Sequence, residues 1–421
     1  MYNQRYTKGA KLMKLTKEEK SWILYDVANS AFILIITATL PIYFRSLAES
    51  SGVSPNVVTA WWGSATSIAL FLLALASPFL GAIADYKGYK KKLFFGFLML
   101  GILSSFLFVI VDQWQAFLFL YIVARIGYSA TNVFYDGMLV DVTTNERMDH
   151  VSSMGYALGY VGSTIPFVIG LVLIFFNEAI GISVGLATQL SFIITIIWWF
   201  LLSIPLLKNV KQTYYLEHQP QIVKTSFKRV IQTFKDIKKT PKLKYFMLAY
   251  FFYIDGVYTI ISMATSFGGE VGIDDTAMLL ALLLTQFVAF PFAIWASKLA
   301  KKFGSLTIIK VCIIIYGFVA VFGFFLAHEW QFWMLAIIIG MAQGGVQSLS
   351  RSYFGQMVPK EKANEYFGFF DIFGKFADFM GPMLITFSSL VFGQSKYGIL
   401  FLVILFVIGY SFLNKIEPDT I

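Results

Sequence analysis

Long apolar stretches dominate this chain of 421 residues and most restrict how it can fold. A helix needs about 20 mostly apolar residues to cross a bilayer. We count twelve such stretches, joined by short loops except for one polar, basic segment at residues 208–244. The sequence therefore predicts an all-α integral membrane protein with twelve transmembrane helices, at about residues 22–46, 59–80, 93–111, 115–137, 152–176, 184–207, 245–267, 277–299, 304–326, 331–350, 365–392 and 396–413.

The distribution of charge predicts which ends of these helices face the cytoplasm. Charged residues make up only 14% of the chain, against roughly 25% in soluble domains, and the net charge is +9. With both termini in the cytoplasm, 28 of the 33 Lys and Arg residues fall in cytoplasmic segments. This asymmetry follows the positive-inside rule and argues against a nucleic-acid-binding surface. We expect a multi-pass protein of the cell membrane with cytoplasmic N- and C-termini.

The sequence offers no pattern for a metal, a cofactor or an enzyme active site. The only cysteine, Cys312, lies within a predicted span, and His150, His218 and His328 lie far apart in loops. No Gly-x4-Gly-Lys-[Ser/Thr] loop is present, so ATP is not expected to be the direct energy source. We expect no cofactor and no metal, and a protein that is not an enzyme. A receptor is also disfavoured, because the longest loop, at 208–244, is too short for a sensor domain.

Several short patterns recur once, about half the chain apart. Gly88 and Gly304 are related by an offset of 216 residues, and Glu146-Arg147 and Glu361-Lys362 by 215. A chain that repeats itself across apolar helices predicts two similar halves, as in secondary transporters. We expect a basic tail at 1–21, a six-helix bundle at 22–207, a cytoplasmic linker at 208–244, a second six-helix bundle at 245–413 and a short tail at 414–421. The linker is expected to contain an amphipathic helix, with Phe227, Val230, Ile231 and Phe234 on one side.

One loop carries the pattern Gly81-x3-Asp85-x2-Gly88 followed by lysines. Gly81 would let two helices approach closely, Gly88 would permit a tight turn, and Asp85 would accept hydrogen bonds from an opposing helix N-terminus. The loop resembles the signature of the major facilitator superfamily. In the second copy Lys301 stands in place of the aspartate, so the charged contact is expected only in the first half. We assign Gly81, Asp85, Gly88 and Arg351 to a cytoplasmic gate.

Charged residues inside the predicted spans are candidates for function, because each costs roughly 2.5–3.5 kcal/mol at the bilayer centre. Arg125 and Asp255 lie near the midplane, about ten residues into their spans. Asp371, Lys375 and Asp378 share one face of a helix, which also suits a salt-bridge ladder that neutralises itself. Asp26 lies near the start of the first span, where its carboxylate would also suit the helix dipole.

These residues suggest a cavity for a polar or zwitterionic solute. For solute binding the predicted residues are Arg125, Asp255, Lys375, Asn29, Tyr258 and Gln347. For proton coupling they are Asp26, Asp255 and Asp378, because a carboxylate buried in a membrane can carry a proton.

Several segments resemble the Unknown Major Facilitator family, which is related to fungal autophagy-associated vacuolar amino-acid effluxers. They are Tyr25-Asp26-Val-Ala-Asn29-Ser30, Phe134-Tyr135-Asp136, Gly155-Tyr-Ala-Leu-Gly159, Tyr253-Ile-Asp255-Gly256, Gly344-Gly-x-Gln347-x-x-Ser350-Arg351 and Phe367-Gly-Phe through Lys375. Val27 departs from the pattern, since a tryptophan is common there. The resemblance implies the major facilitator fold, built from two pseudo-symmetric six-helix bundles, and efflux of amino acids or similar solutes.

The sequence as a whole predicts a monomeric secondary active transporter that moves a small polar solute by alternating access and is coupled to protons. Its partners would be the solute, protons and the lipid bilayer. The main alternative is an exporter of drug-like or lipid-like amphiphiles, which would have a largely apolar cavity and a self-paired set of charges at residues 371–378. An integral-membrane receptor or enzyme is the remaining possibility.

Overall fold

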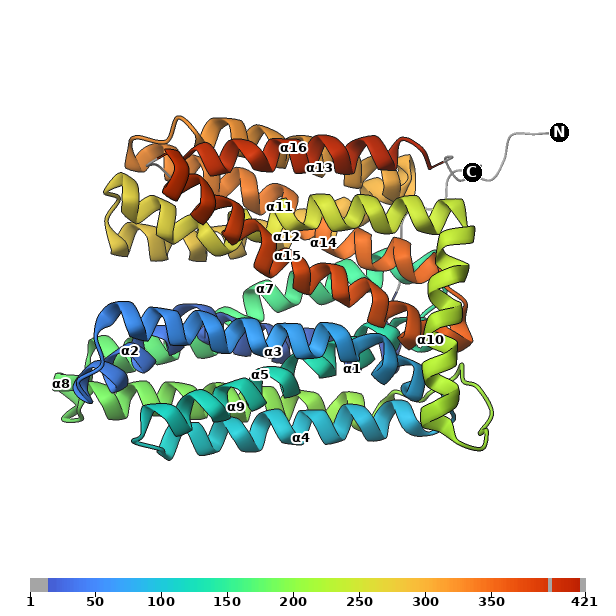
Figure 1. Ribbon diagram of the computed structural model, residues 1–421, viewed down its shortest axis with the longest axis horizontal. Helices are drawn as coiled ribbons and strands as arrows, with labels where there is room; N and C mark the ends of the chain where they lie inside the picture. Colours follow the sequence, from blue (N-terminus) through green and yellow to red (C-terminus); the bar gives the residue numbers. More distant parts are fainter. Residues whose placement is uncertain (1–13, 393–395, 417–421) are drawn as a thin grey trace.

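Two bundles of roughly parallel helices lie side by side in a computed structural model, which describes residues 14–392 and 396–416 (Figure 1). The first half of the chain forms one bundle. Its helices are α1 (Lys17–Ala38), α2 (Leu40–Ser50), α3 (Pro55–Ala84), α4 (Tyr89–Ile110), α5 (Trp114–Gly137), α6 (Leu139–Val142), α7 (Asn145–Phe175), α8 (Asn177–Ile180) and α9 (Val184–Asn209).

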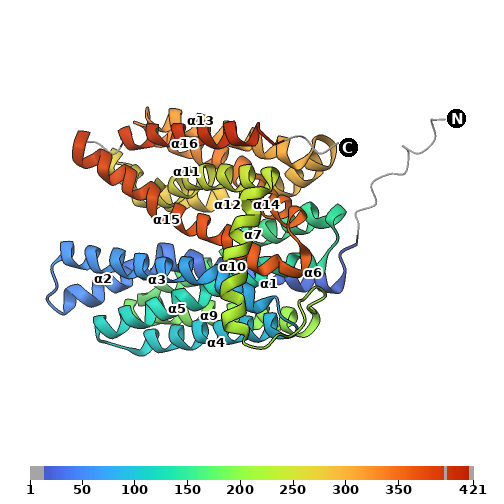
Figure 2. The same cartoon turned by 45° about the vertical axis from the view of Figure 1, so that its right-hand side comes forward.

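The second half forms the other bundle, and a separate helix crosses between the two. The second bundle contains α11 (Pro241–Val271), α12 (Asp275–Phe303), α13 (Ser305–Gly323), α14 (Glu329–Met357), the short 3-10 helix η1 (Lys360–Lys362), α15 (Ala363–Phe392) and α16 (Lys396–Leu413). Helix α10 (Ile222–Lys239) belongs to the linker and runs across one end of both bundles (Figure 2). We call this end of the molecule the α10 end.

Eleven helices among the described residues are long and apolar enough to cross a membrane. Helix α15, at 30 residues, also exceeds the length that a bilayer requires, and it runs alongside the others (Figure 1). These helices confirm an all-α membrane protein, and the count of exactly twelve crossings stays a prediction. Large apolar side chains such as Phe71, Phe119 and Ile314 are more than half exposed on the outer surface, as expected for side chains in contact with lipid.

The first predicted span differs from a single helix at 22–46. Helix α1 ends at Ala38, and α2 begins at Leu40, with Pro41 in its first turn. Proline has no N–H to donate and its ring clashes with the carbonyl four residues earlier, so the helix is interrupted before it. The backbone remains nearly continuous, because the N–H of Thr39 donates to the carbonyl of Ile35 at 3.0 Å.

The two bundles meet along two sets of helices. Helix α3 packs against α15, and α7 packs against α12 and α14. Glycine allows the first of these contacts, since a Cβ atom at Gly81 would lie 2.1 Å from the carbonyl oxygen of Asn364, and one at Gly368 would lie 2.5 Å from that of Ser77. The close approach expected at Gly81 is therefore present. The turn expected at Gly88 is also present, because this residue has a φ of 79°.

The linker is ordered against the first bundle before it reaches α10. Backbone hydrogen bonds join the N–H of Leu216 to the carbonyl of Asp85 at 2.8 Å and the N–H of Lys87 to the carbonyl of Leu216 at 3.0 Å. The amphipathic helix expected in the linker is α10, whose apolar residues include Phe227 and Ile231. The loop after α3 and the linker therefore form one structural unit at the α10 end.

The contact at Gly81 can be tested by enlarging this residue. Gly81→Leu places side-chain atoms where the backbone of Asn364 lies, so we expect α3 and α15 to separate at the α10 end and the protein to lose several kcal/mol of stability, in the range of other overpacked sites. Thermal unfolding of the purified protein in detergent measures this change. Gly63→Leu on the same helix is the control. A Cβ atom at Gly63 would meet no atom within 4 Å, so this variant should unfold like the parent protein. Equal melting temperatures for the two variants would contradict the close approach.

Candidate functional site

Arg125 is a buried cation at the middle of a membrane-spanning helix. It stands at the midpoint of α5 (Trp114–Gly137) and is 8% exposed. Its Nε and Nη1 atoms have no hydrogen-bond partner among the described residues, and its guanidinium carbon lies 5.7 Å from the centre of the Tyr128 ring. A buried guanidinium normally has an anionic partner, because burying a charge without one is costly. Arg125 is therefore an exception among buried guanidinium groups, and its role in solute binding stays a prediction.

Asp255 is a buried acid near the middle of a helix in the other bundle. It stands at the middle of α11 (Pro241–Val271) and is 1% exposed. The hydroxyl of Thr259, one turn further on, lies 3.5 Å from its Oδ1 atom. Tyr258, between the two, is partly buried. The first bundle thus contains a buried cation, Arg125, and the second bundle a buried acid, Asp255, each near the middle of its helix.

Lys375 forms an ion pair with Asp371, one turn earlier on α15. The hydroxyl of Ser77 on α3 also donates to Asp371, at 2.7 Å, so this carboxylate contacts both bundles. Among the described residues, the arrangement agrees with the interpretation in which the charges of this helix neutralise one another. The side chain of Asp378 lies outside the described residues. A role for Lys375 in solute binding stays a prediction.

Two of the predicted polar residues form side-chain pairs. The Nδ2 atom of Asn29 donates to Oδ1 of Asn132 at 3.2 Å within the first bundle. The hydroxyl of Tyr160 donates to Oε1 of Gln347 at 2.6 Å, which joins α7 of the first bundle to α14 of the second. Gln347 is thus placed at the boundary between the bundles.

Arg351 of α14 reaches from the second bundle into the first. Its Nη2 atom lies 2.9 Å from Oδ2 of Asp26, and its Nη1 atom lies 3.2 Å from Oδ1 of Asp136. It also donates to the hydroxyl and the carbonyl of Ser152, at 3.0 and 3.1 Å. The guanidinium lies over the rings of Trp22, Tyr135 and Tyr156, with centroid distances of 4.6, 5.4 and 4.2 Å. The single cation of Arg351 therefore pairs with two acids of the opposite bundle and packs against three aromatic rings.

Glycine makes room for this group. A Cβ atom at Gly155 would lie 2.4 Å from Oδ2 of Asp26 and 3.1 Å from Nη2 of Arg351. The segment Gly155-Tyr-Ala-Leu-Gly159 thus lets α7 approach the ion pair. Asp26, expected as a proton carrier, and Arg351, expected at a gate, are brought together in one cluster.

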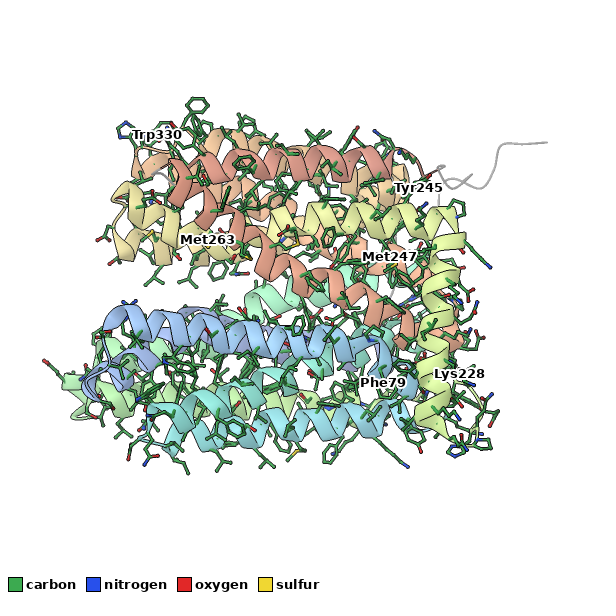
Figure 3. The ribbon with its side chains drawn as sticks, in the orientation of Figure 1. Phe79, Lys228, Tyr245, Met247, Met263 and Trp330 are labelled. Atoms are coloured by element: carbon green, nitrogen blue, oxygen red, sulfur yellow. The ribbon has the colours of Figure 1, made fainter. Side chains whose placement is uncertain are left out.

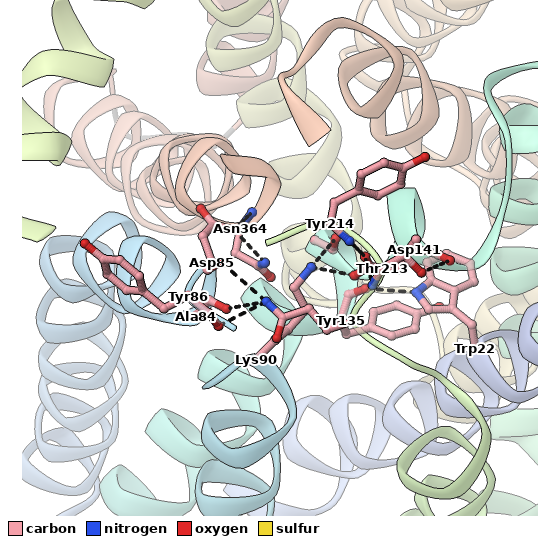
Figure 4. Close-up of polar contacts among 12 residues, drawn as sticks. Trp22, Ala84, Asp85, Tyr86, Lys90, Tyr135, Asp141, Thr213, Tyr214 and Asn364 are labelled. Carbon is pink, nitrogen blue, oxygen red and sulfur yellow. Dashed lines mark hydrogen bonds and ion pairs between the residues drawn. The ribbon is translucent and has the colours of Figure 1, made fainter. Parts of the chain in front are cut away.

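Asp85 binds the start of the facing helix α15, as the sequence predicts. Its Oδ1 atom accepts from the backbone N–H and the side-chain amide of Asn364 at 3.0 and 2.9 Å, and Figure 4 shows these two residues together. Its Oδ2 atom accepts from the N–H of Glu365 at 3.1 Å. Burial raises the pKa of Asp85 to about 7, while Lys90, the hydrogen bond from Asn364 and Arg229 act to lower it. The charge of Asp85 at neutral pH therefore depends on these partners.

Arg229 joins the linker helix to both bundles. It forms an ion pair with Glu365 of α15, donates to the carbonyl of Ala82 at 3.0 Å, and lies 3.5 Å from Asp85. Sequence reasoning treated the linker only as an amphipathic segment and missed this residue. Nothing in its spacing distinguishes Arg229 from the neighbouring lysines, because its partners are far away in the sequence.

Asp149 at the start of α7 forms a further contact between the bundles. Its carboxylate accepts from the hydroxyls of Ser305 and Ser352 at 2.6 and 2.5 Å, and from the amide of Gln356 at 3.0 Å. All three donors belong to the second bundle. The repeat contains a signal for this contact, since Asn364, the partner of Asp85, stands 215 residues after Asp149. The second loop copy, which has Lys301 in place of the aspartate, thus also lies beside a carboxylate contact, but the acid is Asp149 of the first half.

A substitution of Arg351 tests the cluster at the α10 end. Arg351→Gln leaves the buried Asp26 and the partly buried Asp136 without a cation, so we expect a loss of about 3–5 kcal/mol of stability, as for other broken buried ion pairs. Unfolding of the purified protein measures the loss, and Arg45→Gln, at an arginine whose side chain is 60% exposed, is the control. Adding Asp26→Asn to Arg351→Gln should recover part of the stability. If the losses of stability of Arg351→Gln and Asp26→Asn simply added in the double variant, the two residues would not be energetically coupled, which would contradict the cluster.

Comparisons with known proteins agree with the fold. The family model described as "Vacuole effluxer Atg22 like" matches residues 15–146 and 140–418. The uncharacterized MFS-type transporter YxiO of Bacillus subtilis is 48% identical over 97% of each chain. The autophagy-related protein 22 of Saccharomyces cerevisiae is 22% identical, over 97% of this chain and 93% of its own length.

Solved structures of transporters share the same architecture. The human organic anion transporter MFSD10 has a TM-score of 0.75 at 12% identity, covering 94% of this chain and 99% of its own. The major facilitator superfamily transporter FucP, in its outward conformation, has a TM-score of 0.71 at 13% identity, covering 96% and 98%. At such identities these structures support the fold. The sequence relatives and the structural neighbours are transporters, not enzymes.

Proposed function

We propose that this chain, which belongs to the vacuole effluxer Atg22-like family and is a secondary transporter of the major facilitator superfamily, carries amino acids out of the cell. The observation that carries this proposal is the Arg125 guanidinium, which is buried at the middle of α5 and has two nitrogen atoms without a partner among the described residues. A carboxylate binds a guanidinium strongly, because its hydrogen bonds join two charged groups.

A zwitterion fits the charges of the two bundles better than a simple anion does. Asp255, buried at the middle of α11, offers a negative charge for an ammonium group. Asn29, Tyr258, Gln347 and Lys375 are the further residues that we propose for contacts with the solute. The name of the matching family, vacuole effluxer, favours export as the direction.

Transport would proceed by alternating access, with the α10 end acting as the cytoplasmic gate. The contacts of Asp85 with α15, of Arg351 with Asp26 and Asp136, and of Asp149 with the second bundle hold this end closed. Gly81 and Gly88 permit the helix contact and the turn that the gate requires. The positive-inside distribution supports a cytoplasmic α10 end and cytoplasmic termini in a cell-membrane protein, which we propose to work as a monomer.

Proton coupling is proposed at the pair Asp26 and Asp136. In the closed state one guanidinium pairs with two carboxylates, so the cluster carries one excess negative charge when both are ionised. When the gate opens, Arg351 moves away with the second bundle and the two acids remain together. Two carboxylates in one buried site readily share a proton, so opening would be linked to proton uptake. Asp255 and Asp378 remain alternative carriers.

One observation favours the alternative of an amphiphile exporter. A mostly apolar pocket lies within the second bundle, lined by residues of α11–α16 such as Phe267, Leu335 and Leu402. Its polar lining consists of Thr259, Thr285, Gln286 and Gln343. An apolar solute would use this pocket and would not require Arg125.

Transport in proteoliposomes distinguishes the two solute classes. With vesicles loaded with labelled amino acids, we expect Arg125→Gln to reduce apparent affinity by about ten- to hundredfold, since a hydrogen bond to a charged group contributes about 1.5–3 kcal/mol. Arg125→Lys keeps the charge without the paired geometry and should be intermediate. Arg45→Gln is the control. Movement of an amphiphilic dye but of no amino acid, unaffected by Arg125→Gln, would overturn the proposal.

Proton coupling is tested in the same vesicles with a separate variant. We expect an imposed pH gradient to drive accumulation by the parent protein, and Asp26→Asn to abolish this effect while solute exchange at equal pH continues. A dye that reports internal pH measures the accompanying proton flux. If Asp26→Asn still accumulates solute against its gradient, the proton is carried elsewhere.

A further inference from the structure

Helix α10 has an unusual distribution of buried and exposed residues. The side chains that it buries against the protein include Ser226 and Thr233, together with the largely buried Arg229. Ile237 near the end of the helix is also buried, but four large apolar residues remain exposed: Val223 by 65%, Phe227 by 63%, Ile231 by 47% and Phe234 by 48%. A helix that simply packed on a protein in water would do the reverse. The exposed apolar side of α10 therefore faces an apolar environment that the chain itself does not supply.

The position of the helix shows what that environment is. Helix α10 lies across one end of the helices that are long and apolar enough to span a membrane (Figure 2). Since such helices end at the membrane surface, α10 is expected to lie near the headgroups. Lys224, Lys228 and Lys235 are exposed beside its apolar side. An exposed apolar stripe flanked by lysines is the pattern of helices that lie in the membrane interface. A bilayer surface thus fits this side of α10 better than water does.

A groove at the start of α10 provides a place for one lipid. Its apolar walls are Phe79 of α3, Tyr89 of α4, and Val223 and Phe227 of α10, and Lys224 and Lys228 line it as well. Figure 3 shows Lys228 on α10 and Phe79 near the adjoining end of α3. His218 also lines the groove, with its ring stacked on that of Tyr89 at a centroid distance of 6.2 Å.

The charges of the groove select the headgroup. Its lining contains two lysines and one histidine and no acidic residue. The two lysines are four residues apart, so they point from the same side of the helix. We propose that this groove binds an anionic phospholipid, with the headgroup phosphate between Lys224 and Lys228 and an acyl chain along Phe79 and Phe227.

Native mass spectrometry of the full-length protein in detergent tests the site. Phosphatidylglycerol and phosphatidylcholine with identical acyl chains are added, and the fraction of protein carrying lipid is measured. We expect preferential binding of phosphatidylglycerol, and a loss of about thirtyfold in apparent affinity for Lys224→Gln/Lys228→Gln, because each lysine near an anionic surface contributes about fivefold. Phe227→Ser, which keeps both charges, should weaken the binding of both lipids.

The control removes the same charge from another exposed site at the α10 end, with Lys301→Gln/Lys302→Gln. This variant should bind phosphatidylglycerol like the parent protein. An equal loss in both double variants would mean that net charge, and not the groove, attracts the lipid, and no loss in either would place the lipid elsewhere; each result overturns the proposal. Full competition by glycerol phosphate at the lipid concentration would show a site for soluble phosphate and would equally overturn it.

Discussion

The insertion of Arg351 into the opposite bundle is the interaction on which the closed α10 end most depends. Its guanidinium pairs with Asp26 and Asp136 at once and lies against three aromatic rings, so removing it would leave one buried and one partly buried carboxylate without a cation. A buried cation of this kind is costly unless its geometry is nearly complete, and here Ser152 supplies the remaining acceptors. The cluster therefore strongly stabilises the arrangement in which the bundles are in contact. An arrangement in which they are partly separated would lose most of this stabilisation.

Local patterns predicted much of the fold, because they report directly on local physics. The apolar stretches marked the spanning helices, and the loop at 81–92 predicted both a left-handed turn at Gly88 and the contact of Asp85 with a helix start. The break at Thr39 was missed, although Pro41 marks it. The apolar residues continue through Pro41, so composition alone predicts one long helix here. The proline was the only sign that the chain forms two helices, and it was given too little weight.

The candidate site was predicted only in part, because its contacts join residues far apart in the sequence. Arg125 and Asp255 stood out, since a charge within a span is anomalous in its own segment. Asp149, Glu365 and Arg229 lie near span ends or in the linker, where charges are ordinary. Their importance comes from partners more than a hundred residues away, and only the internal repeat, which aligns Asp149 with Asn364, contains a trace of it.

The placement of the acids at the α10 end underlies our proposal that this end responds to protons. Asp26, Asp85, Asp136 and Asp149 all belong to the first half, and the groups that bind them across the interface all come from the second half. The pseudo-symmetry of the two halves would allow one acid of the two repeated contacts in each half. Because Lys301 replaces the second aspartate and Asp149 takes its role, both acids, Asp85 and Asp149, lie in the first half. Separation of the bundles thus leaves several carboxylates on one surface without their donors. Our proposal of proton coupling follows from this arrangement, because protonation would relieve the repulsion among these carboxylates and so would favour an open α10 end.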